Sequence, residues 1–384
     1  MRYLTAPLIY TPNFKLEQNK ILVLHDNLHV AALVDYTTVE PSMVQHFEGI
    51  LSPGFVNTHC HLELSHLHNK IPQGTGLVDF LSHIRGTDPA TLQQKINEAY
   101  LQDKAMYSAG TVAVGDISNH AYTIEVKLQS KIKYHTFVEC LGVDGTQADD
   151  KFSYFKKIFN QFSQYFEGVS MTLHALYSCS FELFNLIQES DESGLLYSMH
   201  HLETLAERSF FNVKDNALRN AMTPFVANNY KIPYNNKSST VNVIPLLNTD
   251  RPTLLVHNTY IKQADFDYLG SLENSLHYCT CPQANQYIEG TLPDYNLWKK
   301  NTANITIGTD SLASNNQLSM IEEINCIQHY APYVPLESLL KWATHNGAFF
   351  LDVIDTLGSF EKDKKPGVVQ IIGERGAMQS KLIC

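Results

Sequence analysis

Short apolar runs alternate with longer amphipathic stretches along most of the chain. Runs rich in valine, leucine and isoleucine predict buried strands. Eight such runs occur, at Gly54–Asn57, Thr111–Asp116, Tyr134–Glu139, Ser170–His174, Leu195–His200, Thr253–His257, Ser275–Tyr278 and Ile305–Gly308. Between them, apolar residues recur at helical spacing in Thr91–Ser108, Asp150–Phe166 and Thr204–Asn229. In the first of these helices the expected buried stripe contains Leu92, Ile96, Ala99 and Met106. Eight strand–helix alternations are typical of a (β/α)8 TIM barrel, an α/β fold of about 250 residues.

The two ends of the chain show a different pattern. Strand-like runs occur at Lys20–His25 and His29–Asp35, and again at Gly367–Gly373. The simplest arrangement pairs these terminal strands with each other in a small β-sandwich domain formed from both chain ends. We therefore expect one composite β-domain and one barrel inserted into it, with residues 1–52 and 354–384 in the former and residues 53–353 in the latter.

Composition narrows the class of protein. Of the 384 residues, 44% are hydrophobic and 17% are charged, so a large core is possible and global disorder is excluded. The net charge of −11 argues against nucleic acid or an anionic membrane as the partner, because both need a basic face. The 7 cysteines form no framework of repeated spacings, which is typical of reduced thiols. No apolar run reaches the roughly 20 residues of a membrane helix, and no signal-peptide core is found. We expect a cytoplasmic protein.

Histidines and acidic residues gather at the carboxyl ends of the predicted strands. They are His59 and His61 on the first strand, His174 on the fourth, His200 and Glu203 on the fifth, His257 on the sixth and Asp310 on the eighth. Active sites of barrels lie at this end of the strands. We therefore expect these side chains to converge on one site.

The spacing of these residues predicts a metal centre. His59 and His61 are two apart on a strand, so both side chains point to the same face. With His200 and Asp310 they form a set that suits one divalent ion, Zn²⁺ first and Fe²⁺ as the alternative. One position is left for a water molecule, which the metal would make nucleophilic. Glu203 follows His200 by three residues and could take that water's proton.

Simpler interpretations exist for each residue alone. An H-x-H pair is weak evidence in a chain with 17 histidines. A single histidine at a strand end is commonly just hydrogen-bonded, and Asp310 could be a turn residue or a helix N-cap. The joint occurrence of these residues, in strand order and at the same end of each element, favours the metal site.

Several segments resemble motifs of the amidohydrolase superfamily, in particular its deaminase and chlorohydrolase branch. They are Pro53–Leu62 (PGFVNTHCHL), Leu173–Ser178 (LHALYS), His200–Thr204 (HHLET), Leu255–Asn258 (LVHN), Cys281–Asn285 (CPQAN) and Gly308–Asn315 (GTDSLASN). The resemblance implies that His59, His61, His200 and Asp310 are metal ligands. It implies catalytic roles for Glu203, His257 and Asp310, and substrate contact for His174. Members with two metals usually carry a lysine at the end of strand four, and none stands there, so one metal is expected.

A narrower resemblance concerns the substrate. The segments His61–Ser65, Lys70–Pro72, Gly76–Phe80, Cys281–Ile288 and Leu292–Asp294 are similar to aminodeoxyfutalosine deaminases of menaquinone biosynthesis. This implies a small-molecule nucleoside substrate, 6-amino-6-deoxyfutalosine, and release of ammonia. Glu63 is expected to line the substrate pocket, or alternatively to orient a ligand histidine. We also expect a homodimer.

Other functions stay open at this point. The alternative substrates are methylthioadenosine, S-adenosylhomocysteine and other amino-heterocycles. A related hydrolase of cyclic amides is the second class, and a non-catalytic scaffold is disfavoured because every ligand position is filled.

Overall fold

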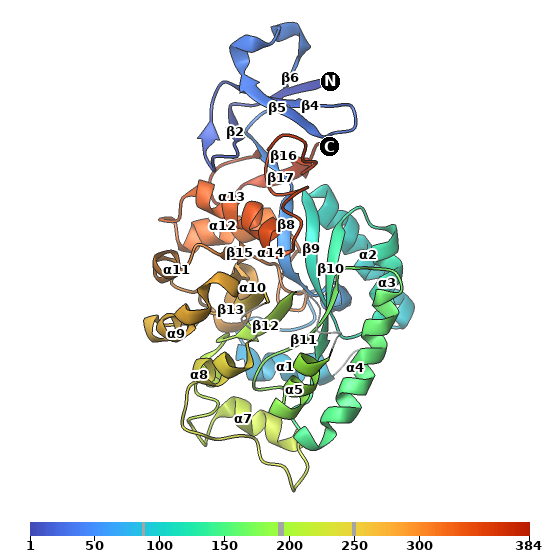
Figure 1. Cartoon of the computed structure of the whole chain (residues 1–384), viewed down its shortest axis with the longest axis vertical. Helices are drawn as coiled ribbons and strands as arrows, with labels where there is room; N and C mark the ends of the chain where they lie inside the picture. Colours follow the sequence, from blue (N-terminus) through green and yellow to red (C-terminus); the bar gives the residue numbers. More distant parts are fainter. Residues whose placement is uncertain (87–88, 191–195, 248–250) are drawn as a thin grey trace.

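Both chain ends lie together at one end of the molecule, beside a longer α/β part (Figure 1). The computed structural model describes residues 1–86, 89–190, 196–247 and 251–384. Among these residues, no helix is both long and apolar enough to span a lipid bilayer.

The α/β part contains two four-stranded parallel sheets, ordered β11-β10-β9-β8 and β12-β13-β14-β15. The strands are β8 (Phe55–Cys60), β9 (Thr111–Ser118), β10 (Lys133–Cys140), β11 (Val169–Leu173), β12 (Tyr197–His201), β13 (Thr253–His257), β14 (Leu276–Thr280) and β15 (Ile305–Ile307). Each coincides with a predicted strand to within a few residues. Leu195, the expected start of one strand, lies outside the described residues. Most of these strand residues are buried, as expected of parallel sheets covered by helices.

The two sheets contact each other on both sides. Asp310, just after β15, forms an isolated parallel bridge with Cys60 at the end of β8. Its N–H group donates to the carbonyl oxygen of His59 at 3.0 Å. On the other side, the N–H group of His200 in β12 donates to the carbonyl oxygen of His174, after β11, at 2.8 Å. These contacts bring the carboxyl ends of strands from both sheets together.

Helices connect the strands and surround the sheets (Figure 1). They are α1 (Gly76–Gly86), α2 (Leu92–Ser108), α3 (Ile124–Gln129), α4 (Ala148–Ser163), α5 (Phe181–Glu189), α6 (Leu205–Arg208), α7 (Ala217–Met222), α8 (Ser239–Val243), α9 (Gln263–Leu269), α10 (Pro282–Glu289), α11 (Tyr295–Asn301), α12 (Met320–Tyr330), α13 (Leu336–Ala343) and α14 (His345–Phe350), with a 3₁₀ segment η3 (Leu62–Leu67) after β8. Helix α2 begins with a capping box, because Thr91 and Gln94 each accept the other's backbone N–H group. Ala99 and Met106 of its predicted stripe are buried and Ile96 is half-buried, but Leu92 is exposed in the first turn.

The amphipathic stretch Thr204–Asn229 is helical only in part. The chain forms two short α-helices there, α6 and α7, followed by a 3₁₀ turn at Thr223–Phe225, and α7 has its own N-cap at Asn216. Phe210 and Phe211, between the helices, are both 1% exposed. The side chain of Asn216 accepts the N–H group of Arg219 at 3.0 Å and donates to the carbonyl oxygen of Ala206 at 2.7 Å, so a new helix starts there instead of the first one continuing.

The terminal strands form two further sheets, ordered β5-β4-β1-β6 and β17-β16-β7-β2-β3. These strands are β1 (Arg2–Thr5), β2 (Leu8–Tyr10), β3 (Leu16–Glu17), β4 (Lys20–Leu24), β5 (Val30–Asp35), β6 (Val44–His46), β7 (Ile50–Pro53), β16 (Val368–Ile372) and β17 (Gln379–Leu382). Strand β16 pairs antiparallel with β7, so the carboxyl-terminal chain does pair with the amino-terminal strands as predicted. The hydrogen-bonded edge strand β17 was not predicted.

Candidate active site

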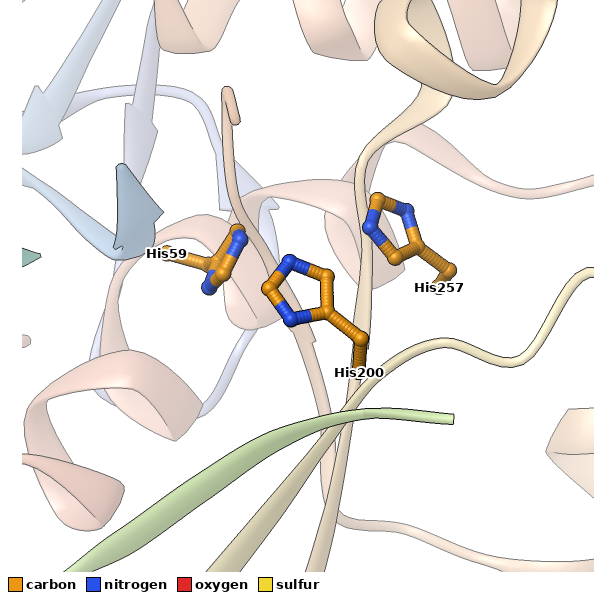
Figure 2. Close-up of side chains that lie close together, drawn as sticks. All are labelled: His59, His200 and His257. Atoms are coloured by element: carbon orange, nitrogen blue, oxygen red, sulfur yellow. The ribbon is translucent and has the colours of Figure 1, made fainter. Parts of the chain in front are cut away.

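Histidines from three strands converge at the carboxyl ends of the sheets. His59 lies in β8 and His61 directly follows it, while His200 and His257 come from β12 and β13. Figure 2 shows His59, His200 and His257 side by side, and one nitrogen of each lies within 4.8 Å of the others. The Nε2 atoms of His59 and His61 are 3.2 Å apart. Asp310 completes the group, with its Oδ1 3.7 Å from Nε2 of His59 and 3.4 Å from Nε2 of His61.

This set of donors fits a small divalent cation. Two ligand atoms held about 2.0–2.1 Å from one ion at a tetrahedral angle lie roughly 3.3 Å apart. The separations among His59, His61 and Asp310 are close to that value. The Nδ1 atom of His200 lies 3.0 Å from the carbonyl oxygen of His174, which leaves its Nε2 for a ligand. The Nδ1 atoms of His59 and His61 are buried and have no hydrogen-bond partner among the residues that the structure describes.

Burial keeps these imidazoles neutral, which is the state that binds a metal. It lowers the pKa values of His59 and His257, and it lowers the pKa of His61 to about 4. Burial and the neighbouring histidines together hold the pKa of His200 well below its ordinary value. Burial alone would raise the pKa of Asp310, but the neighbouring histidines lower it by more. The site therefore offers neutral nitrogens and an ionised carboxylate at neutral pH.

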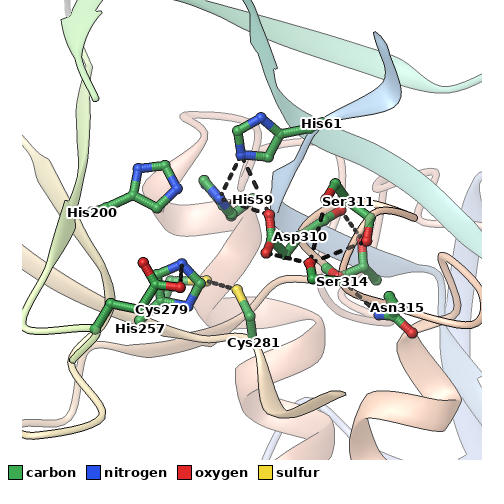
Figure 3. A network of polar contacts seen from close by, with 12 residues as sticks. His59, His61, His200, His257, Cys279, Cys281, Asp310, Ser311, Ser314 and Asn315 are labelled. Atoms are coloured by element: carbon green, nitrogen blue, oxygen red, sulfur yellow. Dashed lines mark hydrogen bonds and ion pairs between the residues drawn. The ribbon is translucent and has the colours of Figure 1, made fainter. Parts of the chain in front are cut away.

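The loop after β15 holds the carboxylate of Asp310 in place (Figure 3). The hydroxyl group of Ser314 donates to Oδ2 of Asp310 at 2.7 Å, so Oδ1 faces the histidines. The side-chain amide of Asn315 donates to the carbonyl oxygen of Thr309 at 2.8 Å and to Glu323 at 2.7 Å. These bonds fold the loop back under the strand end and fix the direction of the carboxylate.

Glu203 and His257 face each other beside the cluster. Nε2 of His257 lies 3.7 Å from Oε1 of Glu203. Nδ1 of His257 lies 2.9 Å from Oδ1 of Asn285 in α10, and this bond places the ring proton on Nδ1. The carboxylate of Glu207 accepts the N–H groups of Leu202 and Glu203, both at 2.8 Å, and thereby fixes the turn that carries Glu203.

The carboxyl group of Glu203 is set up to hold a proton. Burial raises its pKa well above the ordinary value, and the negative charges of Asp310 and Glu289 raise it further. A carboxyl group with a raised pKa can accept a proton in one step and donate it in the next. Glu203 therefore suits general acid–base chemistry next to a metal.

A cavity of about 300 Å³ opens onto these groups. His174 lines it, with its ring 4.6 Å from that of His200 and its Nδ1 atom 2.7 Å from the hydroxyl oxygen of Ser178. Glu63 also lines the cavity and is 1% exposed. Its two oxygens accept the backbone N–H groups of Asn119 and His120 at 2.9 and 3.0 Å. The carboxylate of Glu63 thus fixes the chain after β9 at the cavity wall.

Strand β10 contributes a carboxylate, Glu139, that is not among the residues predicted from the sequence. Glu139 is 2% exposed, its Oε1 lies 3.6 Å from Nδ1 of His200, and its Oε2 accepts from the side chain of Asn119 at 3.2 Å. With His61 and His200 it forms a third group of residues able to hold a cation. Burial raises the pKa of Glu139 to about 8. Its place at the end of a predicted strand is the signal that could have identified it.

The sequence of the chain is also similar to those of known deaminases. Residues 50–371 match the sequence profile of the amidohydrolase family. The chain is 25% identical over 330 residues to an adenosine deaminase of Helicobacter pylori, spanning 84% of this chain and 78% of that protein. It is 26% identical over 293 residues to an aminodeoxyfutalosine deaminase of Nitratiruptor, spanning 73% and 68%.

Solved structures with the same fold are found as well. An aminofutalosine deaminase of Helicobacter pylori in complex with methylthio-coformycin superposes with a TM-score of 0.81 at 22% identity, covering 98% of this chain and 93% of that one. A zinc-bound adenosine deaminase of Xanthomonas campestris gives a TM-score of 0.75 at 18% identity, covering 96% and 84%.

Proposed function

Because the chain belongs to the amidohydrolase family and is a hydrolase of carbon–nitrogen bonds, we propose that it is a metal-dependent deaminase of an adenine nucleoside. The observation that carries this proposal is the meeting of two sets of side chains at one cavity. One set is the cluster of His59, His61, His200 and Asp310, and the other is the pair Glu203 and His257. The names of the two relatives support the reaction and the class of substrate.

In this proposal His59, His61, His200 and Asp310 hold one divalent ion. Three imidazole nitrogens and one carboxylate oxygen suit Zn²⁺, and Fe²⁺ is the alternative. The zinc in a structure of the same fold supports the first choice. When bound, the ion would make a water molecule nucleophilic near neutral pH.

Glu203 and His257 carry the proton steps. Glu203 accepts a proton from the attacking water and delivers it to the ring nitrogen beside the amino-bearing carbon of adenine. Nε2 of His257 faces Glu203 and, since the ring proton lies on Nδ1, it polarises the attacked centre once it has accepted a proton. Asp310 contributes to catalysis through the oxygen that faces the histidines. The carbon–oxygen bond forms first, as the ring nitrogen takes up its proton. The proton of the new hydroxyl group then passes through Glu203 to the amino group, the carbon–nitrogen bond breaks and ammonia leaves. His174 contacts the ring from the cavity wall.

The substrate we propose is 6-amino-6-deoxyfutalosine, used in menaquinone biosynthesis. The Nitratiruptor relative and the fold neighbour from Helicobacter pylori support this choice by their names. Methylthioadenosine and S-adenosylhomocysteine are the second candidates, because a methylthio-coformycin occupies that same neighbour. Glu63 would line the pocket for either class of nucleoside.

We also propose that the two parallel sheets close into one (β/α)8 barrel over residues 53–353. The contacts of Asp310 with Cys60 and of His200 with His174 support this closure. The two terminal sheets would then form a β-sandwich from residues 1–52 and 354–384, which the pairing of β16 with β7 supports.

Metal analysis combined with an ammonia-release assay tests the proposed function. Purified protein should contain about one Zn²⁺ or Fe²⁺ per chain and should release ammonia from adenine nucleosides. The panel should contain 6-amino-6-deoxyfutalosine, methylthioadenosine, S-adenosylhomocysteine and adenosine, with guanine and cytosine as free bases. Preference for a free base, or no ammonia from any nucleoside, would contradict the proposal, whereas preference for methylthioadenosine would contradict only the choice of substrate.

A further inference from the structure

A buried side-chain pair joins the two turns that carry Glu203 and His257. His201, the last residue of β12, is two residues before Glu203, and Asn258 directly follows His257 at the end of β13. The Nδ1 atom of His201 lies 2.7 Å from Oδ1 of Asn258. The two residues are 1% and 0% exposed. This contact therefore connects the two segments whose side chains face each other in the site.

The bonding of Asn258 determines which atom of the pair donates. Its side-chain amide donates to the carbonyl oxygen of Leu255 at 2.7 Å, so its oxygen Oδ1 is the atom that faces His201. An amide oxygen only accepts, and Nδ1 of His201 is therefore the donor. In return, the backbone N–H group of Asn258 donates to the carbonyl oxygen of His201 at 2.9 Å. The two residues are thus bonded in both directions, once through the side chains and once through the backbone.

The backbone of both turns depends on contacts of this kind. Leu202, His257 and Asn258 have positive φ angles of 49°, 71° and 48°. Residues other than glycine seldom adopt this conformation, and it persists where surrounding contacts hold it. A second backbone bond joins the turns, because the N–H group of Tyr260 donates to the carbonyl oxygen of Leu202 at 3.0 Å. The directions in which the turns aim their side chains are therefore set jointly.

His201 itself points away from the reacting groups. Side chains alternate along a strand, so His201 and the preceding residue His200 face opposite sides of the sheet. Nε2 of His201 lies 3.5 Å from the hydroxyl oxygen of Thr240 in α8. Neither His201 nor Asn258 is among the described residues that line the cavity. An effect of this pair on the reaction must therefore pass through Glu203 and His257.

We propose that His201 and Asn258 form a positioning pair that holds the carboxyl group of Glu203 opposite the ring of His257. With the pair intact, Oε1 of Glu203 and Nε2 of His257 keep the separation of 3.7 Å that the structure shows. Without it, the turns relax from their positive φ angles and the two proton-transferring groups lose their alignment. This inference rests on the proposed function, and it identifies two residues outside the cavity on which the rate of the reaction depends.

The test removes each partner of the bond in turn and measures ammonia release from 6-amino-6-deoxyfutalosine and from methylthioadenosine. His201→Leu removes the donor, and Asn258→Gly removes the acceptor while it keeps the backbone N–H group and tolerates a positive φ angle. Each should lower kcat about 10–100-fold, because small displacements of reacting groups have effects of this size. KM and the metal content should stay at the wild-type values, since the pair touches neither the cavity nor the proposed ligand atoms.

Two further variants separate positioning from a general loss of packing. The double variant should be no slower than the slower single variant, since both changes remove the same interaction. His201→Asn should recover most of the rate, because its side-chain amide nitrogen is attached at the same place as Nδ1 of histidine and can donate to Asn258.

His277→Leu is the matched control. His277 is also a buried strand histidine, 2% exposed, but it lies near the amino end of β14, where its ring is 5.1 Å from that of Phe350. This variant should keep the wild-type kcat and KM.

Three results would overturn the positioning role. They are a kcat within about twofold of wild type for Asn258→Gly, losses that multiply in the double variant, and a rate for His201→Asn as low as that of His201→Leu. The first of these decides even if His201→Leu does not fold. Absence of ammonia from every nucleoside with the wild-type protein would instead overturn the proposed function, and this inference with it.

Discussion

Replacing Lys127 with methionine should strongly destabilise the protein, because the change leaves a buried carboxylate without its cation. The Nζ atom of Lys127 in α3 lies 2.6 Å from Oδ2 of Asp116 in β9, and both side chains are fully buried. The other oxygen of Asp116 accepts the N–H group of Leu62 at 2.8 Å. Since Leu62 directly follows His61, this ion pair supports the chain that carries two proposed metal ligands.

The expected size follows from these contacts. Removing one partner of a buried ion pair costs about 3–5 kcal/mol. Lys127→Met also removes a hydrogen bond of 2.8 Å to the hydroxyl oxygen of Thr136. At about 2 °C per kcal/mol, as for a large domain, the unfolding midpoint should fall by roughly 6–10 °C. The double variant Asp116→Asn with Lys127→Met removes the unpaired charge as well, so it should be more stable than the single variant.

Thermal unfolding followed by fluorescence measures this difference. Lys20→Met is the control, because Lys20 forms a pair of similar length, 2.8 Å, with Asp35 at the surface. It should unfold close to the wild-type midpoint, as exposed pairs contribute little. The reasoning about buried charge would be refuted if Lys127→Met unfolded within about 2 °C of wild type, the shift expected for 1 kcal/mol. It would also fail if the double variant were no more stable than Lys127→Met.

Three further outcomes are expected. Glu203→Gln should keep its metal but lose about 10²–10⁴-fold in kcat, measured by ammonia release alongside metal analysis, and near-normal turnover would remove Glu203 from the mechanism. Asp310→Ala should contain well under one metal ion per chain and show no activity, and a fully loaded variant would contradict its role as a ligand. Burial lowers the pKa of His135 from its ordinary 6.5 to about 3, so this ring is neutral in the folded protein. The neutral ring of His135 contributes to stability above pH 6.5. As the pH falls toward 3, the unfolded chain takes up a proton that the folded protein does not, and this contribution is lost by at most about 1.4 kcal/mol per pH unit. His135→Asn should therefore flatten the loss of unfolding free energy between pH 6.5 and 4.5, and an unchanged slope would argue against this origin.

The strands were predictable because parallel strands are buried on both faces. Such strands are near-continuous apolar runs, and the structure places strands over all eight of the runs that were selected. Helix α2 was predictable for a similar reason, since Thr91 supplies a cap just before the periodic pattern. Over Thr204–Asn229 the apolar residues also recur at helical spacing, but α6 ends at Arg208 and Asn216 caps a separate helix, with Phe210 and Phe211 buried between the two. Periodicity reports which residues are buried, and tertiary packing decides whether one helix buries them.

Asp310, Glu203 and Glu63 were selected along with the histidines, but two buried carboxylates nearby were not. Glu139 and Asp116 both stand at the ends of predicted strands, just as the selected histidines do. An acidic residue at a strand end is usually solvated, so the sequence gives it little weight. What makes these two unusual is burial among other strands and, for Asp116, the approach of Lys127 from a helix. Such neighbours arise from packing and cannot be derived from spacing along the chain.

The alternation of side chains along a strand explains only in part how the histidine pair is oriented. The alternation of a regular strand was expected to aim His59 and His61 at one ion, yet β8 ends at Cys60 and its register with β9 shifts after Asn57. The backbone is irregular elsewhere in the site too, since His257 and Asp310 have positive φ angles of 71° and 55°. Left-handed conformations of this kind cost on the order of 1–3 kcal/mol each and persist only where surrounding contacts hold them. The bond from Ser314 to Asp310 and the bond between His257 and Asn285 are such contacts. The sequence therefore indicates which atoms can bind a metal, whereas the turns that aim those atoms depend on hydrogen bonds between segments far apart in the chain.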